Sequence, residues 1–127
     1  MQSAGLPLAP CHIARRTLVS ALLCLCTCPD ADAANAIAER LLQERLCACV
    51  NLLPQVQSIY RWQGAVERAQ EVLMLIKTTL ARYAALEQRI AALHPYSVPE
   101  VIALPIQAGL PAYLQWLAEE TRQDSAP

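Results

Sequence analysis

Residues 66–78 read Val-Glu-Arg-Ala-Gln-Glu-Val-Leu-Met-Leu-Ile-Lys-Thr, and this stretch decides the fold. Polar side chains interrupt its first half, whereas residues 72–76 are continuously apolar. A strand that is apolar on both faces is covered on both faces. The stretch therefore predicts one strand whose first half is exposed to solvent and whose residues 72–76 lie in the interior of a sheet.

The residues before this strand predict its hairpin partner. Residues 47–62 favour extended structure, with Pro54 at a bulge or a sheet edge. Every second side chain near the end of this segment shares one face, namely Val56, Ser58, Tyr60 and Trp62. Gln63-Gly64 closes the hairpin, whose two long arms predict a tip that reaches beyond the other strands and towards a neighbouring subunit.

On the N-terminal side, the sequence predicts a strand over residues 18–27 and a helix over 31–45. Pro29-Asp30 ends the strand, and Asp30 serves as the helix cap. Apolar residues recur along one helical face, at Ala34, Ile37, Ala38, Leu41 and Leu42. On the C-terminal side, we expect a helix over 80–93 that stops at His94-Pro95, a strand over 101–106 and a short helix from Pro111.

The order of these elements predicts an α+β fold of the ferredoxin-like, split βαβ type: β-α-β-β-α-β plus a C-terminal helix, with a four-stranded antiparallel sheet. Both long helices then fall on one face of the sheet. The other face stays apolar and bare, and we expect self-association of the chain to cover it. We assign residues 1–17 to a flexible extension, 18–122 to the domain and 123–127 to a disordered tail.

Length and composition narrow the class of protein. A chain of 127 residues fits one domain. Its formal net charge of −1 and the absence of a basic run argue against nucleic-acid binding. Arg15 and Arg16 precede an apolar run that imitates a signal peptide, but the run reads equally well as a strand and is shorter than the roughly 20 residues that span a membrane. We predict a cytoplasmic protein without a membrane segment.

The cysteines alternate along predicted strands, at Cys24, Cys26 and Cys28 and again at Cys47 and Cys49. Neighbours on one face of a strand lie roughly 7 Å apart along it, which is awkward for a disulfide. Reduced thiols are the simpler interpretation. Core packing is expected for Cys24, Cys47 and Cys49, and we expect Cys28, beside Pro29 at the strand end, to be accessible.

Several segments together resemble the CutA family of divalent-cation tolerance proteins over residues 20–121. They are Cys26-Thr-Cys-Pro-Asp30, Leu46-Cys-Ala-Cys-Val-Asn51, Ser58-Ile-Tyr-Arg-Trp62 with Gly64, Ile76-Lys-Thr78, His94-Pro-Tyr-Ser-Val-Pro-Glu100, Leu104-Pro-Ile106 and Tyr113-Leu-Gln-Trp116. The resemblance implies a ferredoxin-like trimer linked to copper and other divalent cations, with no settled enzymatic reaction.

The resemblance points to Cys26 and His94 as metal ligands. Copper-binding members of the family use a first-strand cysteine and two histidines directly before Pro-Tyr, and Leu93 stands here in place of the first histidine. Thiolate and imidazole suit copper and zinc. The competing interpretation is that Cys26 is a small buried hydrophobe and that His94 only ends the helix.

A polar cleft between subunits is a second candidate site. We expect it to be lined by His94, Tyr96, Glu100, Lys77 and Glu71 and to suit an anionic or zwitterionic small molecule or a metal complex. Each residue also has a simpler role: Tyr96 packs a loop, Lys77 extends past the sheet edge and Glu71 forms an ion pair. The aromatic residues Tyr60, Trp62, Tyr113 and Trp116 are expected at an interface between subunits rather than on a ligand platform.

Two hypotheses of function follow from the sequence. The first is a trimeric protein that binds copper or a related divalent cation in the response to metal ions. The second is a trimeric scaffold or signalling module that binds a partner protein or a small metabolite at the inter-subunit cleft. Catalysis is not expected, because the chain has no glycine-rich phosphate loop and no recognisable arrangement of nucleophile, base and acid.

Overall fold

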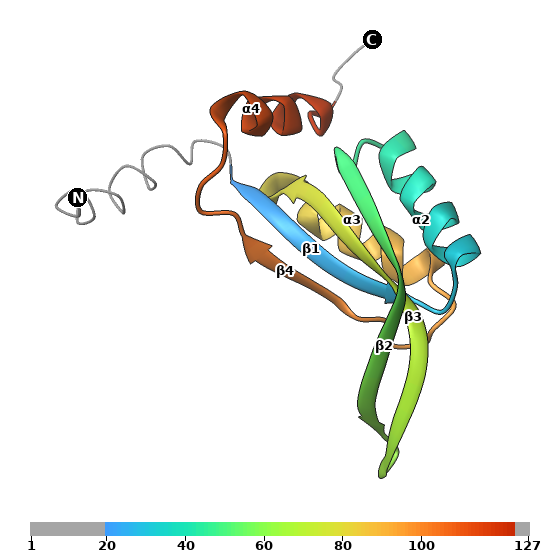
Figure 1. The fold of residues 1–127 in the computed structure, drawn as a ribbon. Helices are drawn as coiled ribbons and strands as arrows, with labels where there is room; N and C mark the ends of the chain where they lie inside the picture. The colour runs from blue at the N-terminus through green and yellow to red at the C-terminus, as the bar shows by residue number, and fades with distance from the viewer. Residues whose placement is uncertain (1–19, 124–127) are drawn as a thin grey trace, which may run out of the picture.

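The computed structural model describes residues 20–123, so the extension predicted at 1–17 and most of the tail predicted at 123–127 lie outside it. The elements follow the predicted order (Figure 1). They are β1 (Ala21–Cys28), α2 (Ala31–Gln43), β2 (Cys49–Trp62), β3 (Ala65–Thr79), α3 (Leu80–Leu93), β4 (Val101–Pro105) and α4 (Pro111–Glu120). β1 begins at Ala21 in the described chain, and residues 18 and 19 of the predicted strand lie outside the described residues.

The four strands form one antiparallel sheet in the order β2-β3-β1-β4. This order is that of the ferredoxin-like fold, so the predicted fold class is confirmed. The second half of β3 lies between β2 and β1, with Met74 opposite both Cys26 and Leu52. Figure 1 shows α2 and α3 together on one side of the sheet, and we call that side the covered face.

The covered face holds the main core. Alternate residues of β1 and β3 point into it and meet the apolar sides of α2 and α3. The most deeply buried members are Cys24, Cys26, Cys28, Met74, Ile76, Ala34, Leu41, Leu86 and Ile90, each with no exposed surface. Removing this apolar surface from water is the main stabilising term of the fold, at about 25 cal/mol per Å².

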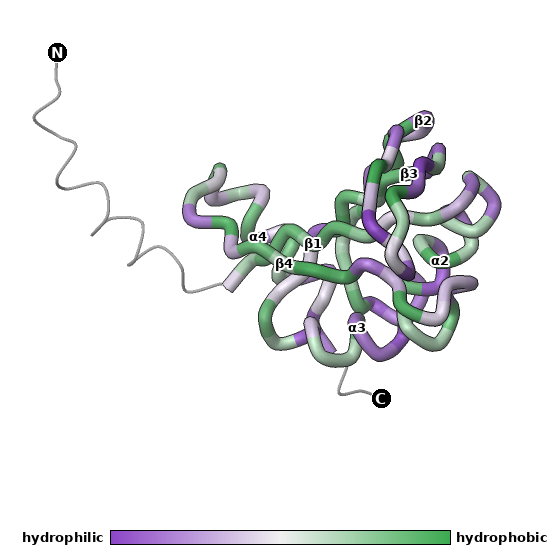
Figure 2. The backbone as a smooth tube through the Cα atoms, turned by 90° about the horizontal axis from the view of Figure 1, so that it is seen from below, coloured by the Kyte–Doolittle hydropathy of each residue, from purple (hydrophilic) through white to green (hydrophobic). Residues whose placement is uncertain are grey.

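The other side of the sheet, which we call the open face, keeps a large apolar area at the surface. In the register of the strands, Leu25 on β1, Leu75 on β3 and Ile102 on β4 lie side by side there. Ile102 and Leu104 remain 50% and 48% exposed. Figure 2 shows hydrophobic residues along both β1 and β4. The predicted bare second face is therefore present.

The β2–β3 hairpin contains one irregularity. The register shifts between Leu53 and Val56, where Pro54 and Gln55 oppose a single residue of β3, and Gln55 has a positive φ of 61°. This is a β-bulge, as Pro54 predicts. The turn at Gln63-Gly64 closes the hairpin with both residues at positive φ, which glycine adopts without strain.

Polar contacts fix the ends of the helices. Asp30 caps α2 by accepting a hydrogen bond from the Ala33 N–H at 2.8 Å, as predicted. Arg45, just after α2, donates to the carbonyl oxygens of Glu119 and Arg122 and so holds the end of α4. Figure 1 shows α4 at the end of the sheet farthest from the hairpin tip. Within residues 20–123, no helix is long and apolar enough to cross a membrane.

Candidate functional site

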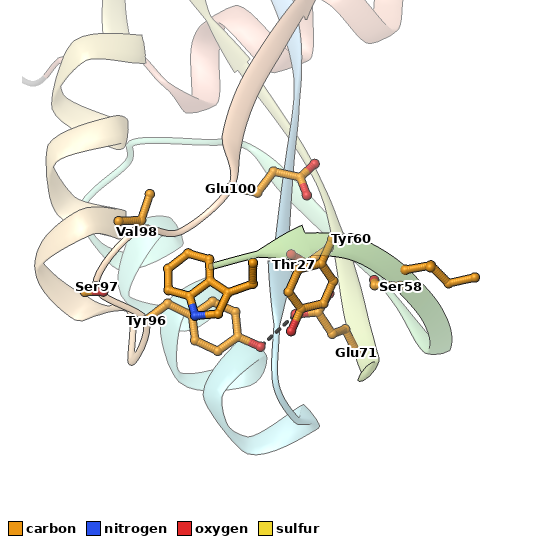
Figure 3. A pocket seen from close by; sticks show the side chains of 10 residues that line it. Thr27, Ser58, Tyr60, Glu71, Tyr96, Ser97, Val98 and Glu100 are labelled. Atoms are coloured by element: carbon orange, nitrogen blue, oxygen red, sulfur yellow. Dashed lines mark hydrogen bonds between the residues drawn. The ribbon is translucent and has the colours of Figure 1, made fainter. Parts of the chain in front are cut away.

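A pocket of about 550 Å³ opens at the base of the long hairpin. The last residues of β1, the outer half of β2, the middle of β3 and the loop between α3 and β4 contribute its walls (Figure 3). The lining residues are Thr27, Ser58, Ile59, Tyr60, Trp62, Glu71, Tyr96, Ser97, Val98 and Glu100. The pocket is thus a mixed site of aromatic rings, hydroxyls and two carboxylates.

Glu71 forms the polar floor of this pocket. Its side chain lies on β3 at the border between the polar and apolar halves of the strand, and only 7% of the residue is exposed. The Tyr96 hydroxyl donates a hydrogen bond of 2.7 Å to Glu71 Oε2 (Figure 3). Burial and this bond raise the pKa of Tyr96, so the phenol stays protonated and remains a donor.

A second group of functional side chains lies behind the pocket, on the covered face. Cys26 and Cys28 of β1 and His94 at the end of α3 bring their sulfur and nitrogen atoms within 4.8 Å of one another, and all three residues are buried. We call this group the thiol–imidazole cluster. Two sulfurs and one nitrogen form a soft to borderline ligand set of the kind that copper and zinc prefer.

The hydrogen bonds of His94 define its tautomer. Nδ1 accepts a bond of 3.0 Å from the Tyr96 N–H, so the ring proton lies on Nε2. Nε2 then donates to the Thr27 carbonyl at 2.8 Å and lies 3.6 Å from the Cys28 sulfur. Both ring nitrogens are therefore engaged, and His94 must give up the Thr27 bond before Nε2 binds a metal ion.

The two thiols of the cluster differ in acidity. A hydrogen bond from the Cys26 thiol lowers the pKa of Cys28 below the usual value for cysteine. The same bond, and then burial, raises the pKa of Cys26. The lowered pKa favours the thiolate form of Cys28, which is the form that binds metal ions.

The structure brings the two predicted metal ligands, Cys26 and His94, into one cluster and adds Cys28. The expectation that Cys28 is accessible was wrong, because β1 extends through residue 28 and α2 and α3 cover that face. The sequence carried a signal for its role: residues two apart on a strand share a face, so Cys28 had to follow Cys26 into the same layer. Leu93 only packs at the rim of the core.

The residues predicted for a polar cleft separate into three places. Glu71, Tyr96 and Glu100 line the pocket, together with Tyr60 and Trp62, which were expected at an interface between subunits. His94 lies in the thiol–imidazole cluster. Lys77 lies six positions along β3 from Glu71, a distance of about 20 Å at the usual strand rise, and donates instead to Asn51 and Cys49. Among the described residues, no lysine, arginine or histidine lines the pocket.

Tyr113 and Trp116 also lie away from the pocket. They pair on α4 with ring centroids 5.6 Å apart and stay partly exposed. Burial, and then proximity to the Cys49 thiol, raise the pKa of Tyr113, which places this ring beside the Cys49 end of the sheet. The pocket residues that sequence reasoning missed are Thr27, Ser58, Ile59, Ser97 and Val98, which carry no distinctive chemistry by themselves.

These features define a class of small ferredoxin-like domains with one open sheet face, a long hairpin and a buried thiol–imidazole cluster. The model of the CutA1 divalent ion tolerance protein family matches residues 22–120. The chain therefore belongs to the CutA1 family, as its motifs indicated.

Individual relatives agree with this assignment. The divalent-cation tolerance protein CutA of Thermus thermophilus is 53% identical over 97 residues, which cover 76% of this chain and 94% of that protein. Protein CutA of Mus musculus is 48% identical over 99 residues, 78% of this chain but only 56% of the mouse protein. The crystal structure of CutA from Xylella fastidiosa superposes with a TM-score of 0.80 at 47% identity, covering 81% of this chain and 99% of that one.

Proposed function

We propose that this chain is a homotrimeric divalent-cation tolerance protein that binds copper or a related metal ion through Cys26, Cys28 and His94. The observation that carries the proposal is the convergence of two sulfurs and one imidazole within 4.8 Å. The names of the relatives, which refer to divalent-cation tolerance, support the same ligand class. The role is one of binding, in agreement with a family named for tolerance rather than for a reaction.

Metal binding here has two costs that set its behaviour. The thiols must lose their protons, so apparent affinity rises with pH until both are thiolates. His94 Nε2 must also release the Thr27 carbonyl. Because all three residues are buried, we expect an ion to enter only when the chain opens locally, which makes loading slow compared with diffusion.

Zinc calorimetry and copper calorimetry under reducing, anaerobic conditions, after chelator treatment, test the site. We expect one ion per chain in the parent protein and at least about tenfold weaker binding in Cys28→Ser and in Cys26→Ser, His94→Ala. Cys24→Ser is the matched control, since Cys24 is equally buried on the same strand but outside the cluster. Identical isotherms for all the proteins would remove these residues as ligands.

The trimer is proposed from the open face. Half-exposed Ile102 and Leu104 beside Leu25 and Leu75 form an apolar surface that a second copy of the same chain would bury. Light scattering should return about three times the chain mass of 13.9 kDa. Leu104→Lys should lower that mass, whereas Leu42→Lys, an exposed leucine on α2, should not. A parent protein that stays at the mass of one chain would refute the trimer.

We propose a cytoplasmic location, supported by the free thiols of Cys24, Cys26, Cys28, Cys47 and Cys49 among the described residues. Relatives differ in this respect, since one solved structure is described as the periplasmic protein of Archaeoglobus fulgidus and a plant relative as chloroplastic. Cell fractionation with N-terminal sequencing of the native protein tests the location. A mature chain that starts after Cys28 would contradict it.

A further inference from the structure

We propose that the thioether of Met74 is a further ligand of the thiol–imidazole cluster and makes the site selective for Cu(I) over Zn²⁺. The inference rests on the proposed metal binding and deepens it, because it names the ion and one more ligand. Met74 lies on β3 with no exposed surface, in the core beneath α2 and α3 (Figure 1). Its surroundings on the covered face are therefore the same in a single copy and in an assembly through the open face.

The pairing of β1 and β3 brings Met74 to the cluster. Met74 lies directly opposite Cys26, and Cys28 is two residues further along β1, opposite Val72. On one face of an antiparallel pair, a long side chain reaches both its opposite and its diagonal neighbour. The Met74 sulfur accordingly lies 3.6 Å from the sulfur of Cys28, whose thiol donates a weak hydrogen bond to it.

The distances around Cys28 match those between two ligands of one metal ion. Its sulfur is 3.6 Å from the Met74 sulfur and 3.6 Å from His94 Nε2. With bonds of about 2.3 Å to sulfur and about 2.0 Å to nitrogen, as in zinc sites, ligand atoms at tetrahedral angles lie roughly 3.5–3.8 Å apart. Cys28 therefore already lies at ligand spacing from both neighbours.

The thioether is also free to bind. Among residues 20–123, the one hydrogen bond that its sulfur accepts is that from Cys28. His94, by contrast, must first release the Thr27 carbonyl. A thioether has neither a proton to lose nor a charge to desolvate. Binding through Met74 therefore requires neither deprotonation nor the loss of a bond to the backbone.

The chemical type of the donors decides which ion the site takes. Thiolate and thioether are the soft ligands that suit Cu(I), whereas zinc sites are built from thiolate, imidazole and carboxylate. Among the described residues, no aspartate or glutamate belongs to the cluster, which excludes hard ions such as Mg²⁺ and Ca²⁺ that require several oxygen ligands. Met74 thus supplies a donor that Cu(I) uses and Zn²⁺ does not.

Met74→Leu tests the ligand, because leucine nearly conserves the volume of methionine and removes the sulfur. Cu(I) affinity of the full chain is measured without oxygen by competition with bathocuproine disulfonate, and zinc affinity by calorimetry. We expect the variant to bind Cu(I) at least about tenfold more weakly and zinc within about twofold of the parent. Ile76→Val is the matched control and should leave both affinities unchanged, since Ile76 is equally buried on β3 but lies opposite Cys24.

Selenium spectroscopy observes the ligand directly. The chain has two methionines, Met1 and Met74, so selenomethionine labels Met74 and one residue outside the described part of the chain. After loading with Cu(I), X-ray absorption at the selenium edge should show a copper atom bonded to selenium. The labelled Met74→Leu protein, whose selenium is at Met1, should show none. A purely structural role of Met74 would not produce this signal.

Cys28→Ser, measured alongside, separates the role of Met74 from the metal site itself. If Cys28→Ser loses both metals while Met74→Leu keeps its full Cu(I) affinity and the labelled parent shows no selenium–copper bond, the metal site stands and Met74 is not a ligand. An equal loss of Cu(I) and zinc in Met74→Leu would also overturn the proposal, since the sulfur would then not confer selectivity. If Cys28→Ser binds both metals as the parent does, the proposed metal site fails, and the role of Met74 fails with it.

Discussion

The two faces of the sheet use the same strands in opposite ways. On the covered face, Cys26, Met74 and Ile76 are fully buried beneath two helices, and the functional groups there are neutral thiols and an imidazole. On the open face, half-exposed aliphatic side chains give way to a pocket with carboxylates and aromatic rings. The comparison teaches that burial by the chain itself selects soft, uncharged chemistry, whereas the face left for other molecules carries the charge.

The largest expected effect tests the burial difference directly. Leu41→Ala should lower the free energy of unfolding by about 2–5 kcal/mol at every protein concentration, because Leu41 is enclosed by its own chain. Leu104→Ala removes the same atoms from the open face, which only the proposed trimer buries. Its effect on the free energy of unfolding should therefore depend on protein concentration. Urea denaturation at two concentrations measures both, with exposed Leu42→Ala as the control. A concentration-dependent loss for Leu41→Ala would break the comparison.

The second effect tests the preference of the covered layer for neutral groups. Burial raises the pKa of Cys47 from 9.0 to about 12. Above pH 9 the unfolded chain ionises this thiol while the folded chain does not, so stability should fall as pH rises towards 12, by at most about 1.4 kcal/mol per pH unit. Chemical denaturation between pH 8.5 and 10.5 should show a shallower slope for Cys47→Ala. The same slope in both proteins would exclude Cys47 as the cause.

A third effect compares two tyrosine–glutamate pairs. Tyr96→Phe removes the donor to buried Glu71 and should cost about 1–3 kcal/mol. Tyr83→Phe breaks an equivalent bond of 3.1 Å to Glu87, which is exposed, so it should cost less than about 0.5 kcal/mol. Thermal denaturation of the two variants side by side measures the difference. Equal losses would mean that Glu71 is better hydrated than its burial indicates.

The smallest effect concerns the N-terminal cap of α2, directly after β1. Asp30→Ala removes the cap of α2 and should destabilise the protein by about 1 kcal/mol. Asp32→Ala, in the same first turn but without a capping bond, should cost less. Helix content and melting temperature by circular dichroism separate the two variants. A larger loss for Asp32→Ala would show that charge near the helix end matters more than the cap.

The sequence predicted the covered face well and the open face only in part. Periodicity placed the strands and helices because apolar spacing reports burial within one chain. Cys26 and His94 followed from a family motif, but Cys28 was misjudged because its neighbour Pro29 marks a strand end without showing what covers it. Lys77 and Glu71 looked equivalent in sequence, and only their separation along β3 assigns one of them to the pocket.

The β-bulge at Pro54-Gln55 determines which side chains of the outer half of β2 lie on the same side of the sheet as Glu71. If β2 alternated regularly beyond Leu53, its odd-numbered residues would lie on that side. Because of the bulge, Val56 pairs with Glu71, and the even-numbered residues Tyr60 and Trp62 lie on that side. Deleting Gln55 alone would remove the bulge but leave Val56 opposite Glu71, so both rings would keep their side of the sheet. The bulge thus accommodates one extra residue in β2 while Leu53 and the two rings stay on the same side of the sheet.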